Sequence, residues 1–592
     1  MSKKTTSEII EKIINLKKIK VMKIKSLLIG MLACSAMVAC TNEDAPVNNG
    51  TDTQKGDAYV TVKLSMSGNA GSRGFSDGGF EEVESNSNEV KVNKAIFYFL
   101  DANNQGCANK YTLGDVTKLA EWAESEDENA STDLTSQAVV VIKNPIATPA
   151  SIVCLINADD PFTDNNRPSL AQIQAAVVDM SKANHTTNGF MMTNSVYVKG
   201  NGNDANVIVG APIKAENIHK SDADATVGNK DIDTSAPVVI PVERVAAKVK
   251  MQFDSSITNS TIEPTLTNNT NKYNIKAEIT GWWLASKANK SYLVKNLSKT
   301  YDIFATDWWN DVTNTRSYWA NMPTMTAENY TNETTWEGAN ATNVAEYCLE
   351  NTSTVIDEKD QDGTGTATQY AARAILKKDG VATTFVRYLN TIYTQVDFFQ
   401  LIADAYNSYR IKVEEGETVV TYDLNGQPMI QGKTAIATVL GWIYNTKASP
   451  IDGLEDYEGM VTVTAPTTTG QSLVKVTTDA AGNETYTAVE AATIQDEIRT
   501  RIDKVLLWLN GQTYYYTDII HNNDGEAPLY GVVRNHLYTL NVKGLTGMGT
   551  PVPNPKLPIN PERPENDEYS HISAQVQILS YKVVPTQDVT LR

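Results

Sequence analysis

The sequence is poor in the residues from which most catalytic and metal sites are built. Only five cysteines and five histidines occur in 592 residues. The cysteines form no C-x-x-C pair and have no histidine cluster beside them, which argues against a zinc site. A Gly-x-Ser-x-Gly elbow is also missing. The sequence therefore gives no support to an enzyme, and we expect no cofactor and no metal. The cysteines are Cys34, Cys40, Cys107, Cys154 and Cys348.

Positive charge is scarce as well. Lys and Arg number 51 against 70 Asp and Glu, a net charge of −19. Residues 1–39 hold eight lysines and two glutamates, so the rest of the chain carries 43 − 68 = −25. Such a surface repels a phosphate backbone, which argues against nucleic acid as a partner.

Two short patterns approach known ligand loops without completing them. Residues 427–434 end in Gly-Lys-Thr, but Gln427 stands where a phosphate loop needs glycine. Residues 357–363 are acidic like a calcium loop, yet Gln369 takes the place of the bidentate glutamate. We interpret both segments as solvated polar loops.

The only long apolar run indicates export. Residues 26–39 are apolar and follow Lys23 and Lys25, and the run is too short to span a bilayer comfortably. It ends in Ala-Met-Val-Ala before Cys40, with polar residues after it. This resembles a bacterial lipobox, so we expect signal cleavage and lipidation of Cys40 with fatty acids such as palmitate. Translation could start at Met1 or at Met22.

Apart from these absences, the clearest positive feature is one strand pattern that occurs at both ends of the chain. Apolar and polar residues alternate with period two, as in a strand with one buried face. The apolar positions near the start are Val60, Val62, Leu64 and Met66. Those near the end are Ile572, Ala574, Val576 and Ile578. Two strands of one pattern can compete for one place in a sheet.

The surroundings of the two strands favour such an exchange. A glycine-rich loop with Arg73 follows the first strand, and exposed loops of this kind are sites of proteolysis. Residues 547–564 contain six prolines and predict an extended linker before the second strand. Cutting the loop would let the first strand leave, and the tail of a neighbouring copy could fill the vacancy.

The rest of the chain predicts a mainly β protein with a few helices, arranged as two β-sandwich-like domains. A domain boundary is expected near residue 240. Expected strands cover residues 92–100, 138–142, 151–156, 238–253, 273–285, 371–376, 460–464, 514–520 and 536–542. Expected helices cover residues 168–183, 395–409 and 491–509.

Several segments together resemble a known family. They are Cys40 in its lipobox and residues 189–194 (GFMMTN), 242–249 (VERVAAKV), 510–515 (NGQTYY), 519–521 (IIH), 531–538 (GVVRNHLY), 547–551 (GMGTP) and 576–584 (VQILSYKVV). In this order they resemble the fimbrillins of Bacteroidales, specifically the Mfa-like shaft subunits of the minor fimbrium among type V pili. The resemblance runs from about residue 22 to residue 592. Tyr581 stands where relatives carry Trp, so an aromatic anchor is kept.

The resemblance implies an assembly mechanism and transthyretin-like sandwich domains. The precursor is lipidated at Cys40 and carried to the outer membrane, where an arginine-specific protease cuts between Arg73 and Gly74. The donor strand of another subunit, including Tyr581, then fills the opened groove, giving a head-to-tail fibre with accessory anchor and tip subunits. The implied parts are a signal peptide (1–39), a propeptide (40–73), an N-terminal domain (74–240), a C-terminal domain (241–546), a linker (547–570) and a donor tail (571–592).

Three roles compete on this basis. A shaft subunit needs both a cleavable loop and a free tail, and this chain has both. An anchor subunit would lack the first, and a tip subunit the second. The alternative outside the family is a surface lipoprotein that binds glycans through Trp282-Trp283 or Trp308-Trp309, although core packing is the better interpretation of these pairs.

Overall fold

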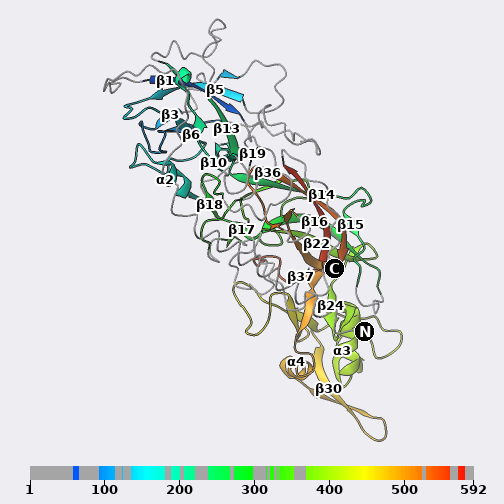
Figure 1. Cartoon of the computed structure of the whole chain (residues 1–592). Coiled ribbons are helices and arrows are strands. Elements are labelled where there is room, and N and C mark those ends of the chain that lie inside the picture. The colour runs from blue at the N-terminus through cyan, green and yellow to red at the C-terminus, as the bar shows by residue number, and fades with distance from the viewer. Residues whose placement is uncertain are drawn as a thin grey trace, which may run out of the picture. The chain divides into compact units, whose positions relative to one another are not determined.

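A computed structural model of the chain confirms the predicted fold class, which is mainly β with several sheets (Figure 1). Residues 55–592 form one compact unit. The structure describes residues 58–65, 92–113, 123–124, 135–179, 189–199, 206–219, 238–266, 273–297, 315–316, 320–325, 330–331, 334–352, 368–522, 529–559 and 571–580. Within these ranges, no helix is long and apolar enough to cross a membrane.

The N-terminal part is built on one sheet of order β3-β2-β6-β8-β13-β1-β5-β4, with β11 and β12 paired at its side. Its inward side chains form a single hydrophobic core. The strands are β1 (Ala58–Ser65), β2 (Ala95–Leu100), β3 (Tyr111–Leu113), β4 (Ala123–Glu124), β5 (Thr135–Ile142), β6 (Ser151–Ile156), β8 (Met192–Asn194), β11 (Ala211–Pro212), β12 (Ile218–His219) and β13 (Val238–Arg244).

The predicted strand 238–253 serves two sheets. Its first half is β13, and after Val245 its second half, β14, enters a sheet of order β21-β14-β36-β38. This sheet packs on another of order β15-β16-β22-β33-β37 around a second core. The strands are β14 (Ala246–Phe253), β15 (Thr261–Ile262), β16 (Ile275–Ala285), β21 (Glu346–Leu349), β22 (Gln369–Lys378), β23 (Val381–Ala382), β33 (Gln512–Asp518), β36 (His536–Thr546), β37 (Thr550–Pro551) and β38 (His571–Ser580).

A third core, which the sequence did not predict, is formed by the segment that connects two paired strands. β22 and β33 are hydrogen-bonded neighbours, yet residues 386–507 between them supply a core cluster of their own. Two sheets and two helices surround it. They are β24 (Phe385–Tyr388), β25 (Thr391–Thr394), α3 (Gln395–Ala405), β26 (Tyr409–Glu415), β27 (Thr418–Tyr422), β28 (Leu440–Ile443), β29 (Glu458–Val463), β30 (Gln471–Thr478), β31 (Glu484–Ala488), α4 (Ala491–Arg499) and β32 (Val505–Trp508).

Short elements complete the described chain. They are α2 (Leu170–Ala175), β7 (Val177–Asp179), β9 (Tyr197–Lys199), β10 (Asn206–Ile208), β17 (Lys287–Ala288), β18 (Lys290–Tyr292), β19 (Thr315–Arg316), β20 (Tyr330–Thr331), β34 (Ile520–Asn522), β35 (Leu529–Tyr530) and the 3-10 turns Ala215–Asn217 and Leu509–Gly511.

All three predicted helices are shorter than expected: α3 ends four residues early, at Ala405, and α2 and α4 lose more. A capping box at Ser169 starts α2, but Ala176 is already extended and the next residues pair with β18 as β7. α4 ends at Arg499, and the predicted last turns form β32, which pairs with β24 and β29. In both cases adjacent β-branched or apolar residues fit a strand as well as a helix, and tertiary pairing decides.

The proline-rich segment is also more ordered than predicted. Thr550–Pro551 pairs with the edge of β33, and Pro558 forms a bridge with Thr335. Proline is compatible with such edge positions because its missing N–H is not needed there. Met548, Val552 and Ile559 are buried. The predicted linker is therefore packed on the fold at least as far as Ile559.

Candidate functional site

The first predicted strand is an interior strand of the N-terminal sheet. β1 pairs antiparallel with β5 along its whole length, from Ala58 opposite Ile142 to Ser65 opposite Thr135. On its other side it runs parallel to β13, and β12 pairs with its first residues. Removal of β1 would therefore open two ladders at once and leave unpaired N–H and C=O groups on both neighbours.

The apolar face of β1 faces the core, as its alternation predicts. Val60, Val62 and Leu64 are each fully buried in the N-terminal core. At about 1.5–3 kcal/mol for each large side chain, their exposure to water would cost several kcal/mol. Met66, the fourth predicted position, lies outside the described residues. The slot that β1 fills is thus a hydrophobic groove that requires an occupant.

The predicted C-terminal strand exists, and it lies on the chain's own C-terminal sheet. β38 runs antiparallel along β36, from His571 opposite Thr546 to Ser580 opposite His536. It is the outer strand of that sheet, with β36 on one side. The tail is thus held by one ladder, whereas β1 is held by two. Tyr581 lies outside the described residues.

Other predicted site residues also fall outside the described ranges. These are Cys40, Arg73, Gly74, the acidic loop 357–363 and Trp308-Trp309. Their roles remain predictions.

The described ligand candidates have structural roles. Trp282 and Trp283 are buried, so this pair packs in the core and offers no face to a sugar. Residues 427–434 form a loop between β27 and β28, without the strand-to-helix turn of a phosphate loop. Lys433, its only basic residue, is instead paired with Glu415 at 2.6 Å.

The three described cysteines, Cys107, Cys154 and Cys348, are free and buried, so no disulfide bridge joins them. Burial raises the pKa of the Cys107 thiol to about 11, with Asp101 adding to the shift. Burial and then Glu346 raise the pKa of Cys348 to about 12. Burial alone raises the pKa of Cys154 as well. Thiols in this state stay protonated at neutral pH and react slowly.

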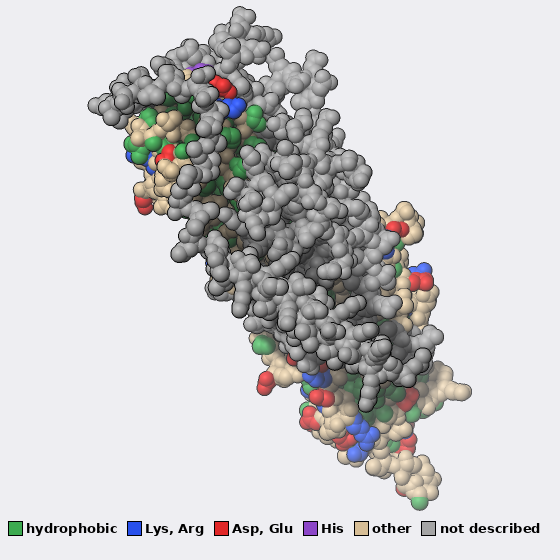
Figure 2. All heavy atoms as spheres, in the orientation of Figure 1, with side chains coloured by type: hydrophobic (Ala, Val, Ile, Leu, Met, Phe, Trp, Pro, Cys, Tyr) green, Lys and Arg blue, Asp and Glu red, His purple; other side chains and the backbone are tan. Residues whose placement is uncertain are grey.

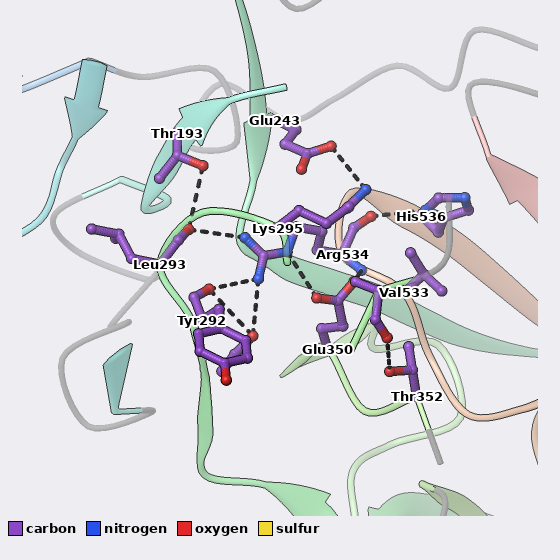
Figure 3. Close-up of polar contacts among 12 residues, drawn as sticks. Thr193, Glu243, Tyr292, Leu293, Lys295, Glu350, Thr352, Val533, Arg534 and His536 are labelled. Carbon is purple, nitrogen blue, oxygen red and sulfur yellow. Dashed lines mark hydrogen bonds and ion pairs between the residues drawn. The ribbon is translucent and has the colours of Figure 1, made fainter. Parts of the chain in front are cut away.

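Three of the sequence segments quoted above meet at one buried polar cluster where β13 passes into β14 (Figure 3). We call it the joint. It combines residues of 189–194, 242–249 and 531–538 with residues 291–295 and Glu350. Sequence spacing gave no sign of this, because the segments lie hundreds of residues apart.

Arg534 is the centre of the joint. Its side chain is fully buried and its Nε lies 3.1 Å from Oε2 of Glu350, which is equally buried. The remaining guanidinium N–H groups donate to the carbonyl of Leu293 at 2.9 Å, to Oγ of Ser291 at 3.0 Å and to the carbonyl of Tyr292 at 2.6 Å. A buried arginine with this many partners fixes residues 531–538 relative to residues 291–293 and Glu350.

A second set of contacts ties β13 to the same point. Glu243 of β13 pairs with Lys295 at 3.1 Å, and both side chains are buried. Arg244 donates to the Asn535 side chain at 3.3 Å, while the Asn535 N–H donates to the carbonyl of Ala246 at 2.8 Å. β13, which forms one side of the β1 slot, is thus fixed to the residues that immediately precede β36.

A glycine is required where this segment begins. Gly531 has a φ of +120°, and a Cβ at this position would lie 1.9 Å from the carbonyl oxygen of Asn351. Only glycine accepts this backbone and this close approach. Gly531 thereby brings Val532 into pairing with Asn351, next to Glu350.

The described surface shows basic and acidic side chains next to one another (Figure 2). Among the described residues, Lys276 pairs with Glu263 and Lys412 with Glu414, and at least one partner of each pair is exposed. Pairs of this kind contribute little to stability.

Comparison with known families gives one match, to the C-terminal part. Residues 507–586 match the model described as major fimbrial subunit protein type IV, fimbrillin, C-terminal. This range contains β33, β36 and β38 together with Arg534 of the joint. No sequence among the curated proteins matches the chain.

Solved structures give weaker likenesses. A putative cell adhesion protein from Parabacteroides distasonis is 10% identical, with a TM-score of 0.35, over 88% of this chain and 99% of that one. The tip fimbrial protein Mfa3 from Porphyromonas gingivalis is 11% identical, with a TM-score of 0.27, over 88% and 99%. A fimbrial assembly protein from Parabacteroides distasonis is 10% identical, with a TM-score of 0.25, over 62% and 96%.

Proposed function

Since residues 507–586 match the fimbrillin C-terminal model, in agreement with the resemblance predicted from the sequence, we propose that this chain is a structural subunit of a cell-surface fimbrium. The observation that carries the proposal is the pair of strands at its two ends. β1 fills a two-sided slot in one sheet, and β38 is a tail strand of the same alternating pattern.

Assembly begins with cleavage of the loop that follows β1. The precursor is exported and anchored in the outer membrane through a lipid on Cys40. An arginine-specific protease cuts after Arg73, so that the new chain starts at Gly74 and β1 is no longer covalently attached. Cleavage alone does not empty the slot, because the buried face of β1 and its two ladders still hold it there. Departure of β1 therefore requires a competitor.

The competitor is β38 of a neighbouring subunit. Its residues Ile572, Ala574, Val576 and Ile578 present the same period-two apolar face as β1. To enter a slot it gives up one ladder, to β36, and gains two, to β5 and β13. The two ladders and the buried face that β38 gains replace those that β1 gives up, and the cleaved β1 then diffuses away from the slot. Before exchange, pairing with β36 keeps the tail's own edge occupied.

Among the roles known in the family, the combination of a slot and a terminal strand favours a shaft subunit. A shaft subunit must accept a strand and donate one, and this chain offers a fillable slot and a terminal strand. The finished fibre then supports adhesion, with separate anchor and tip subunits at its ends. The glycan-binding alternative is weakened because its described tryptophan pair is buried.

Truncation of the tail tests the proposal. Deleting residues 571–592 should leave a folded subunit that can accept a strand but cannot donate one, because β38 is an outer strand. Cells that express only this form should show no ladder of high-mass species on unboiled gels, and Edman sequencing should still give a start at Gly74. If the truncated form still gave a normal ladder of high-mass species, the tail would not be the donor.

A further inference from the structure

The end of the slot where β1 begins carries two basic side chains. Ala58 lies opposite Ile142, and the exposed Lys143 follows at once. Arg167 lies beside it, since its guanidinium donates to the carbonyl of Asn144 at 2.9 Å. We call Lys143 and Arg167 the basic entrance.

Neither residue of the basic entrance is engaged by a carboxylate within the described part of the chain. Lys143 instead holds its ammonium 5.7 Å from the ring centroid of Tyr111. Of the three carboxylates that precede Arg167 in its loop, Asp159 pairs with Lys94 and Asp160 with Lys110, while Asp164 is exposed and forms no ion pair with either basic residue within the described part of the chain. The basic entrance therefore retains its charge for a partner.

An acidic segment of the chain lies just before the tail strand, as the basic entrance lies just beside the start of β1. Residues 562–568, which end three residues before β38 begins at His571, contain four carboxylates and one arginine. A strand that entered the slot in the direction of β1 would bring this segment to the Ala58 end, where the basic entrance lies.

The other end of the slot lies next to β4, where the sequence is acidic. There β4 places Glu124 opposite Ser136, which is itself opposite Leu64. From Glu124 to residue 133 the sequence holds five carboxylates and neither Lys nor Arg. Lys582 follows β38 by two residues, so the same direction of entry would bring a cation to this end. The reverse direction would set acid against acid and base against base.

We propose that residues 562–568 of one copy dock on Lys143 and Arg167 of the next copy, and that this contact sets the direction in which β38 enters the slot. The inference rests on the proposed function and deepens it by naming the surface that receives the incoming tail. Complementary charge at the rim of an interface acts mainly on the association rate and on the choice of register.

The test measures the entry rate of a labelled tail. The protein is the full chain cut after Arg73, and the probe is a fluorescent peptide of residues 560–592. The variant is Lys143→Glu with Arg167→Glu. Its matched control is Lys447→Glu with Arg501→Glu, two exposed residues in the third core region. Lys143→Glu alone serves if the double variant folds poorly, as judged by its melting temperature.

The expected result is an association rate constant lowered on the order of tenfold in the entrance variant, and unchanged in the control. A peptide with Glu565→Lys, Asp567→Lys and Glu568→Lys should enter the variant faster than it enters the wild type. The wild-type rate should fall as salt is raised, since screening shortens the range of these charges to about 3 Å at 1 M.

Two results would overturn the inference, and they can be told apart. If both peptides enter the wild type and the variant at equal rates, the basic entrance has no part in docking while the proposed exchange stands. If neither peptide enters any cleaved protein, the exchange itself fails and the inference fails with it.

Discussion

Cells that carry Arg73→Ala should retain a lipidated, full-length monomer and lose the high-mass ladder altogether. The reason is the hold on β1, which is buried on its apolar face and hydrogen-bonded on both sides. With the loop intact, a displaced β1 remains covalently tethered to its own subunit. Its effective concentration at the slot then exceeds that of any neighbouring tail. Unboiled gels and mass spectrometry of the membrane fraction measure the outcome.

Two controls make this experiment specific. Arg73→Lys should block assembly as fully as the alanine variant if the protease requires arginine, and trypsin added to those cells should restore it. Arg501→Ala removes an exposed arginine elsewhere and should leave the ladder intact. A normal ladder from Arg73→Ala would move the processing site to another residue.

Replacing Arg534 with methionine should produce the largest loss of stability of any single side-chain change discussed here. It leaves the Glu350 carboxylate buried without its cation, and removal of one partner of a buried pair costs about 3–5 kcal/mol. It also leaves the carbonyl groups of Tyr292 and Leu293 without this donor. Denaturant unfolding of the uncleaved subunit measures the change in the free energy of unfolding.

The matched variants separate charge burial from simple loss of an arginine. Arg501→Met, at an exposed position whose guanidinium lies over the Tyr406 ring, should change the free energy of unfolding by no more than about 1 kcal/mol. Arg534→Met combined with Glu350→Leu should recover part of the loss, because no unpaired charge is left. Equal stability of Arg534→Met and the wild type would show that the joint does not hold the fold together.

Local pattern predicted local structure well. The strand at 151–156 was predicted with the bounds that the structure gives, and alternation placed Val60, Val62 and Leu64 on the buried face of β1. These predictions succeed because period-two alternation depends on burial of one face, which each strand records in its own residues. The same reasoning over-extended α4, because Val505 fits the helix spacing with Ile502 and Leu509 as well as the strand spacing with Leu507.

The sequence did not show which strands pair or which distant side chains meet. Nothing in β1 indicates that it runs parallel to β13, and nothing in β38 indicates that it rests on β36. The third core was missed because its limits are set by the pairing of β22 with β33 across the segment between them. The joint was missed for a related reason, since Arg534 and Glu350 lie 184 residues apart.

The central claim is that the tail strand of one subunit replaces β1 in the next. Electron cryo-microscopy of the assembled fibre tests it most directly, through the identity of the strand between β5 and β13. The account predicts density for residues 571–580 in that slot, continuous with a neighbouring subunit, and no density for residues 58–65. A fibre whose every slot still holds Ala58–Ser65 of a cleaved or uncleaved propeptide would contradict it.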